Sequence, residues 1–293
     1  MTLSTLAAQP DLSPQQMRRF SELVYAKIGV TISPQKVTLL SNRLRRRLRA
    51  SRIESYDAYF EHLRTTSTDT PEWEAFLQEV TTHETYLFRD EAHWEWIRNV
   101  LVPDLMQQAR IGKRKPTFRA WSAACSTGDE ATSLACCLAD RLQPLNDWKI
   151  EIVGTDVGSG AVETARRGEF GERAMRLVPE SMRRRFFEFD AQRKCWSSKD
   201  VLRRMLTFRT HNLLTPLKEQ PFDLVLLKNV LIYFDAASKK QVIGELRRTV
   251  RPGGYLITGA AEGVADLIRD LDSTNGWLHR FPQASLAKSG AKA

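Results

Sequence analysis

The chain has 293 residues, of which 42% are hydrophobic and 27% are charged, and its formal net charge is +9 at neutral pH. These proportions are typical of a soluble globular protein. The sequence has no run of eighteen apolar residues and no secretion signal at its start, so neither a membrane span nor export is expected. The positive charge indicates an anionic partner: a nucleic acid, an acidic protein or a membrane surface.

Residues 1–82 are expected to form a small all-α domain. Ser13 followed by Pro14 is a typical helix start, with the serine as N-cap. The apolar residues of this first helix recur at helical spacing; they are Met17, Phe20, Val24 and Ile28. A second helix begins after Ser33, and its apolar stripe comprises Val37, Leu40, Leu44 and Leu48. Two shorter helices are expected in "SYDAYFEHL" and "PEWEAFLQEV", and no strand pattern occurs in this region.

The second part of the chain alternates strand-like and helical segments. The expected strands cover residues 117–123, 148–156, 221–230 and 253–260. This alternation indicates βαβ units and therefore an α/β domain with a parallel sheet. Between Gly168 and Thr210 the pattern is less regular and includes a basic cluster, so we interpret this stretch as an insertion.

The segment "WSAACSTGDEATS", residues 121–133, is typical of a strand end, a tight loop and a helix start. A phosphate-binding loop needs several glycines or a Lys–Ser/Thr pair, so that backbone N–H groups can face the phosphates. This loop has one glycine, and the carboxylates of Asp129 and Glu130 would repel phosphate. They suit S-adenosylmethionine, which carries a sulfonium, an ammonium and a ribose diol but no phosphate.

Asp156 ends the second expected strand of the sheet, in "EIVGTD". An acid at this position of a doubly wound sheet is the usual partner of a ribose hydroxyl. The alternative for Asp129 and Asp156 is that each only caps a helix. Four cysteines lack the spacing of a metal site, so we expect reduced thiols, no bound metal and a cytoplasmic location.

Several motifs together resemble those of the chemotaxis receptor methyltransferases. These motifs are "VTTHETYLFRD", "WSAACSTGDEATS", "IVGTDVGSGAVETAR", "RTHNLLTP", "FDLVLLKNVLIYFD" and "RPGGYLITGAAEG". Members of this family transfer a methyl group from S-adenosylmethionine to receptor glutamates and release S-adenosylhomocysteine. The resemblance implies a helical domain at residues 1–82 and a Rossmann-like methyltransferase domain at residues 83–293. It also implies a small β insertion at about residues 171–208.

The resemblance also implies roles for individual residues. It assigns cofactor binding to His83, Thr85, Arg89, Glu130, Asp156, Asn212, Leu213, Asn229 and Val230, and catalysis to Arg89 and Tyr233. A glutamate carboxylate is already ionised at neutral pH, because its ordinary pKa is about 4.3, so methyl transfer needs alignment rather than a general base. Arg89 and Tyr233 would therefore position the acceptor. The alternatives are a surface ion pair for Arg89 and a buried aromatic for Tyr233.

The expected partner is the cytoplasmic region of a chemotaxis receptor, which by family analogy is an acidic coiled coil. Receptor docking is assigned to Arg43, Arg45, Arg46 and Arg49 of the second helix. The alternative is a solvated helix face. Since no glycine lies between Ala174 and His211, we do not expect the insertion to hold a receptor tail peptide. The sequence carries no oligomer signal, and a monomer is expected.

Three positions depart from the family pattern. His83 replaces an asparagine, Lys228 stands where arginine is common, and "GAAEG" at 259–263 replaces "G-H-S-E". These departures leave open a catalytically weakened protein that senses cofactor or acts as a scaffold. A nucleic-acid methyltransferase is less favoured, because "KNVLIYF" lacks the prolines that shape the pocket of amino-methylating enzymes. We therefore expect no nucleic-acid partner and no insertion into a membrane.

Overall fold

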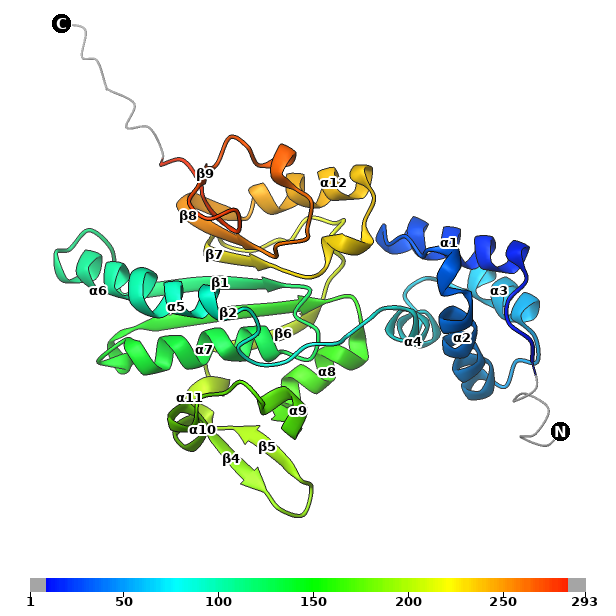
Figure 1. Ribbon diagram of the computed structural model, residues 1–293, viewed down its shortest axis with the longest axis horizontal. Coiled ribbons are helices and arrows are strands. Elements are labelled where there is room, and N and C mark those ends of the chain that lie inside the picture. The colour runs from blue at the N-terminus through cyan, green and yellow to red at the C-terminus, as the bar shows by residue number, and fades with distance from the viewer. Residues whose placement is uncertain (1–8, 284–293) are drawn as a thin grey trace, which may run out of the picture.

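The computed structural model describes residues 9–283. Four helices form the first part of this region and pack side by side (Figure 1). They are α1 (Pro14–Ile28), α2 (Val37–Ser51), α3 (Tyr56–Thr65) and α4 (Pro71–Val80). Their buried apolar residues form one core, which includes the residues predicted for the stripe of the first helix and three of the four predicted for the second. Val37, the fourth, is only partly buried against that core.

The starts of α1 and α2 differ. At α1 the Ser13 hydroxyl accepts the N–H of Gln16 at 3.2 Å, and the Gln16 side chain accepts the N–H of Ser13. This reciprocal pair is a capping box, and it confirms the predicted helix start. At α2 a 3-10 turn, η2 (Pro34–Lys36), comes first, so the α-helix begins at Val37 and the Ser33 side chain makes no cap.

A polar network crosses the helical core. The Glu72 carboxylate of α4 accepts the fully buried hydroxyl of Tyr59 at 2.5 Å and pairs with Arg47 of α2 at 2.7 Å. Burial and the neighbouring carboxylate raise the pKa of Tyr59 well above its ordinary value. Glu72 therefore satisfies donors from two other helices, and its loss would leave both partners poorly solvated.

We predict that Glu72→Ala lowers the free energy of unfolding of the helical part by about 2 kcal/mol, because it leaves a buried hydroxyl and a guanidinium without their acceptor. Urea titration followed by circular dichroism measures this loss. Glu74→Ala, at an exposed position of the same first turn, is the control and should change stability by less than about 0.5 kcal/mol. Equal effects of the two variants would show that the network contributes nothing.

A seven-stranded sheet forms the centre of the second part, in the order β6-β2-β1-β7-β8-β10-β9. The strands are β1 (Thr117–Ala123), β2 (Lys149–Asp156), β6 (Leu206–Thr210), β7 (Phe222–Leu227), β8 (Val250–Thr258), β9 (Asp272–Ser273) and β10 (Leu278–Arg280). The first five pair in parallel, while β10 is antiparallel to β8 and β9 to β10. The predicted α/β class with a Rossmann-like sheet is confirmed.

Helices cover both faces of this sheet. Alternate residues of β7 face opposite sides: Leu224 and Leu226 lie in one apolar core, Val225 and Leu227 in the other. The first core is closed by α5 (Glu91–Trp96), the π-turn η3 (Ile97–Leu101), α6 (Val102–Arg110), α7 (Asp129–Arg141) and α8 (Ser159–Arg167). The second is closed by α12 (Ala236–Arg247) and the turn η6 (Ala265–Leu267). A turn at η4 (Leu145–Asp147) precedes β2, and η5 (Leu231–Tyr233) follows β7.

The insertion forms a separate three-stranded antiparallel sheet below the main one in Figure 1. Its strands, in the order β3-β5-β4, are β3 (Glu169–Phe170), β4 (Phe187–Asp190) and β5 (Cys195–Ser198). Its helices are α9 (Glu172–Met175), α10 (Glu180–Phe186) and α11 (Asp200–Arg203). The expected range 171–208 misses β3 and includes the start of β6, which pairs with β2 in the main sheet.

The helical part contacts the sheet through a few polar groups at one edge. The Thr31 N–H donates to the Tyr233 carbonyl at 2.8 Å, and the Asn212 side chain donates to the Lys27 carbonyl at 2.8 Å. On the other side, Gln78 of α4 accepts the N–H of Ala161 in α8 at 2.9 Å. Between these contacts lies a pocket. Within residues 9–283, no helix has the length and apolar composition needed to cross a bilayer.

Candidate cofactor and active site

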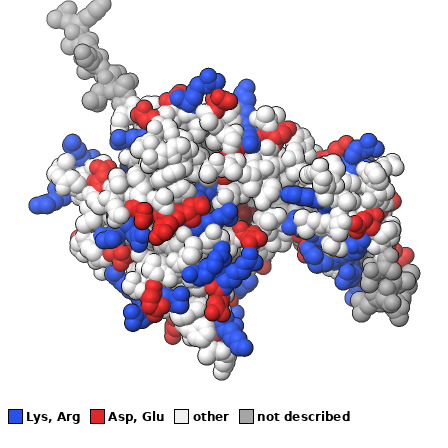
Figure 2. All heavy atoms as spheres, viewed as in Figure 1, with Lys and Arg blue, Asp and Glu red and all other residues white. Residues whose placement is uncertain are grey.

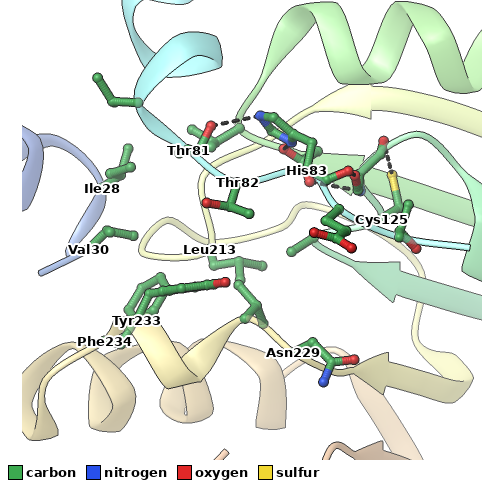
Figure 3. Close-up of a pocket in the computed structure, with 18 of the residues that line it drawn as sticks. Ile28, Val30, Thr81, Thr82, His83, Cys125, Leu213, Asn229, Tyr233 and Phe234 are labelled. Carbon is green, nitrogen blue, oxygen red and sulfur yellow. Dashed lines mark hydrogen bonds and ion pairs between the residues drawn. The ribbon is translucent and has the colours of Figure 1, made fainter. Parts of the chain in front are cut away.

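A pocket opens between the helical part and the carboxyl ends of the parallel strands. Its lining includes all the residues predicted for cofactor binding or catalysis: His83, Thr85, Arg89, Glu130, Asp156, Asn212, Leu213, Asn229, Val230 and Tyr233. Figure 3 shows His83 and Cys125 on one side, Asn229 and Tyr233 on the other, and Leu213 between them. The strands β1 and β7 are neighbours here, and the strand order reverses between them, which is the switch point where doubly wound sheets bind ligands. The structure brings these residues together, and their individual roles stay predictions.

The loop after β1 takes an unusual backbone path along the pocket. Ala124 and Ser126 have φ of 60° and 51°, and Gly128 has φ of 87°. Left-handed backbone at non-glycine residues costs of order 1–3 kcal/mol each and persists only where the surroundings fix it. Here the Ser126 N–H donates to the Asp156 carboxylate at 2.9 Å, which fixes the loop against β2.

The two neighbouring acids, Asp129 and Glu130, have different surroundings. The Glu130 side chain lines the pocket and accepts the Ser122 hydroxyl at 2.8 Å. Asp129 is buried outside the pocket lining and accepts the Thr127 hydroxyl, and burial raises the pKa of Asp129. Of the two acids, only Glu130 lines the pocket, so the expectation that Asp129 also faces a ligand is wrong.

The Asp156 carboxylate lies deeper and joins two loops. One oxygen accepts the Ser126 N–H, and the other accepts the Gly158 N–H at 2.9 Å. His83 stands beside it, with Nδ1 3.7 Å from Asp156 Oδ1 and Nε2 2.7 Å from the Thr81 hydroxyl. Asp156 is thus both a pocket acid and a structural acceptor.

His83 stands where the motif resemblance leads us to expect asparagine. Burial lowers the pKa of His83 below its ordinary 6.5, nearby Arg43 lowers it further, and Asp156 partly opposes both effects. The imidazole is therefore neutral at pH 7. Since the folded pKa lies below the unfolded one, protonation as the pH falls below 6.5 destabilises the fold.

Lys228 lies behind the pocket acids. Its side chain is 2% exposed, with Nζ 3.1 Å from the Asp90 carboxylate and 3.5 Å from that of Glu130. The ammonium also lies 5.2 Å from the centre of the Trp94 ring. The departure from arginine at this position therefore keeps a buried cation between two carboxylates. Sequence reasoning missed Asp90, although it closes the motif "TYLFRD".

The turn after β7 depends on Glu262. This buried carboxylate accepts the N–H groups of Asn229 and Leu231, and burial raises its pKa. Asn229 itself has φ of 57°. Glu262 was not predicted as a site residue, although "GAAEG" contains it. The exposed Ala260 and Ala261 of that motif lie outside the pocket lining.

Two donors of the pocket remain uncommitted. The Arg89 guanidinium and the Tyr233 hydroxyl make no hydrogen bond or ion pair with any other residue in the described range 9–283. The Arg89 backbone is fixed, because its carbonyl accepts the indole N–H of Trp94 at 2.7 Å. The pocket therefore offers one guanidinium and one hydroxyl to a ligand.

The side chains present fit S-adenosylmethionine. The carboxylates of Glu130 and Asp156 suit cationic groups and ribose hydroxyls, while Leu213, Val230 and Val157 supply an apolar wall for a base. The Asn212 side chain is committed to the Lys27 carbonyl and the Leu214 N–H, so it would contact a ligand mainly through its backbone. No group of three or more His, Cys, Asp or Glu side chains in the described part of the chain could hold a metal ion.

The fold and the acid-lined pocket at its switch point define the class of S-adenosylmethionine-dependent methyltransferases. Family comparison agrees: residues 83–276 match the SAM binding domain of CheR methyltransferase, and residues 15–81 match its all-alpha domain. The chain belongs to the CheR methyltransferase family, as its motifs predicted, and its cofactor is S-adenosylmethionine.

Curated relatives extend over most of the chain. It is 30% identical over 264 residues to a chemotaxis protein methyltransferase of Salmonella typhimurium, covering 88% of this chain and 87% of the relative. It is 32% identical over 246 residues to chemotaxis protein methyltransferase 1 of Pseudomonas aeruginosa, covering 82% and 86%. The likeness thus includes both the helical part and the sheet.

We predict that Asp156→Ala lowers the affinity for S-adenosylhomocysteine at least tenfold, because it removes a charged acceptor from the pocket and releases the Ser126 loop. Calorimetric titration measures the affinity. Asp147→Ala, at an exposed position before β2, is the control and should bind like the wild type. Unchanged binding by Asp156→Ala would exclude this carboxylate from the cofactor site.

Proposed function

We propose that the chain methylates glutamate side-chain carboxylates on the cytoplasmic region of chemotaxis receptors, giving glutamate methyl esters and S-adenosylhomocysteine. The main support is the pair of uncommitted donors, Arg89 and Tyr233, which line the same pocket as Glu130 and Asp156. The names of the relatives, chemotaxis protein methyltransferases, support the pathway.

The reaction requires the protein to align the acceptor carboxylate with the methyl group, and it requires no general base. When bound, the cofactor supplies a methyl group on a positively charged sulfur. The acceptor glutamate is ionised at neutral pH, so a carboxylate oxygen forms the new bond to carbon while the carbon–sulfur bond breaks, and no proton is transferred. Arg89 would hold the carboxylate through paired N–H donors, and Tyr233 would add one O–H donor.

The helical part would exclude water from this reaction. Ile28, Val30 and Ile32 line the pocket opposite the sheet, and Val30 pairs with Phe234 through an isolated β-bridge. Displacing water strengthens the attraction between a guanidinium and a carboxylate. The helical domain would therefore contribute to catalysis as well as to docking.

A non-catalytic scaffold is the weaker alternative. His83 and the "GAAEG" segment motivated it. His83 lines the pocket beside Asp156, whereas Ala260 and Ala261 lie outside the lining. The third departure, Lys228, keeps a buried cation beside Glu130. The side-chain donors of Arg89 and Tyr233 have no partner within residues 9–283. Catalysis is the simpler explanation of these groups.

The arginines of α2 differ in their availability for receptor docking. Arg43 donates to the Val80 carbonyl at 2.6 Å and lines the pocket, and Arg45 pairs with Asp11 at 2.8 Å. Arg46 pairs with Glu79 but is 53% exposed. Arg49 is exposed and has no ion pair within residues 9–283. We therefore assign docking chiefly to Arg46 and Arg49, and give Arg43 and Arg45 a structural part.

The proposed reaction is tested by labelled methyl transfer to a receptor cytoplasmic fragment. The wild type should give a product that releases methanol in alkali, as glutamate esters do. Tyr233→Phe should lower the rate about tenfold, because one hydrogen bond to a charged group is lost, while affinity for S-adenosylhomocysteine stays unchanged. Alkali-stable label, or label on RNA rather than on the receptor, would overturn the proposal.

The docking role is tested with the double variant Arg46→Glu/Arg49→Glu. Charge reversal should raise the KM for the receptor fragment about tenfold at low salt, with a smaller effect at high salt, because the attraction is screened. Binding of S-adenosylhomocysteine should not change. Arg18→Glu, at an exposed position of α1, is the control for a charge reversal elsewhere on the helical part. A double variant with the KM of this control would place the docking surface elsewhere.

A further inference from the structure

The insertion holds the chain segment that carries Arg89. The Leu87 N–H donates to the Ala174 carbonyl of α9 at 3.0 Å. Arg173 of the same helix forms an ion pair with Glu84. These contacts connect α9 to the stretch that enters the pocket.

A third contact involves an aromatic ring between two arginines. The Arg176 guanidinium, just after α9, lies 3.4 Å from the centre of the Tyr86 ring. The Arg89 guanidinium lies 5.7 Å from the same centre. The ring face of tyrosine attracts cations, so one ring can hold both guanidiniums although they repel each other.

The Arg89 side chain has no other anchor among residues 9–283. Trp94 and Lys228 both donate to the Arg89 carbonyl, at 2.7 and 3.4 Å, and so fix its backbone only. Beyond that point the side chain has several rotatable bonds and no hydrogen bond to direct it. Its orientation toward a ligand therefore depends on the Tyr86 ring.

We propose that Tyr86 is a positioning residue for Arg89, and that Arg176 of the insertion holds the ring in place. This inference rests on the proposed function, in which Arg89 aligns the acceptor carboxylate. The ring keeps the guanidinium in one orientation before substrate binds, with its N–H donors free for the carboxylate. The insertion thereby acts on the reacting end of the pocket without contributing a group to it.

Two substitutions of Tyr86 distinguish the contribution of its ring from that of its hydroxyl. Tyr86→Leu removes the π face and should lower kcat/KM for receptor methylation about tenfold, the range of a partly buried cation–π contact. Tyr86→Phe keeps the ring and should restore nearly the wild-type value. Calorimetric affinity for S-adenosylhomocysteine should stay within twofold in both. A merely structural role would weaken this affinity too, since His83 and Thr85 belong to the same segment.

Substitution of Arg176 tests the insertion's part. Arg176→Ala should lower kcat/KM about threefold to fivefold, with partial rescue by Arg176→Lys, because an ammonium also binds the ring face but stacks less well. Arg184→Ala is the matched control; that side chain is 77% exposed on α10 and, among residues 9–283, pairs only with Glu180. It should leave kcat/KM unchanged.

A double-mutant cycle tests whether Tyr86 acts on the reaction through Arg89 or independently of it. In an Arg89→Ala background, Tyr86→Leu should have no further effect, because the side chain it positions is gone. Additive losses, or loss of activity in Tyr86→Phe equal to that in Tyr86→Leu, would overturn the positioning role. If Arg89→Ala alone is fully active, the proposed function of Arg89 fails instead, and the two failures are distinct.

Discussion

The convergence of parallel strands on one edge of the sheet is the constraint on which the site depends. The strands β1, β2, β6 and β7 all end at the pocket, so residues far apart in the sequence become neighbours there. The Asp156 carboxylate holds two of these loops in place, because it accepts backbone N–H groups from the loop after β1 and from the turn before α8. One buried acid thus sets the shape of two loops, and the strained backbone at Ala124 and Ser126 is maintained by it.

A second group of charges surrounds the buried ammonium of Lys228. Lys228, Glu130 and Asp90 form a chain in which one ammonium serves two carboxylates, and Glu262 fixes the turn after β7 through backbone N–H groups. Burying charges is costly unless each is paired. The arrangement is consistent with a site whose polar groups are ordered before ligand arrives. On the face of the molecule that Figure 2 shows, basic and acidic side chains are interspersed.

Local pattern predicted most of the fold: strand runs and the first Ser-Pro helix start were sufficient for the class. The six ordered motifs, through their resemblance to the family, predicted the family and ten of the residues that line the pocket. Helices α5 and α6 were not anticipated, nor was β6. Asp129 and Glu130 were treated alike, but successive residues of a helix point about 100° apart, so only one could face the ligand. The pairing of Arg45 with Asp11 joins distant parts of the chain, and no helical pattern reveals it.

The pocket is shared between two packed bodies, and this has a thermodynamic consequence. Residues of α1 and α2 line the same space as the turn η5 and the strand ends. A ligand that touches both bodies adds its binding free energy to the stability of their interface, by mass action. The stability of the interface between the helical domain and the sheet would then rise with cofactor concentration. Cofactor binding and the association of the two bodies are therefore linked, and a measurement of one reports on the other.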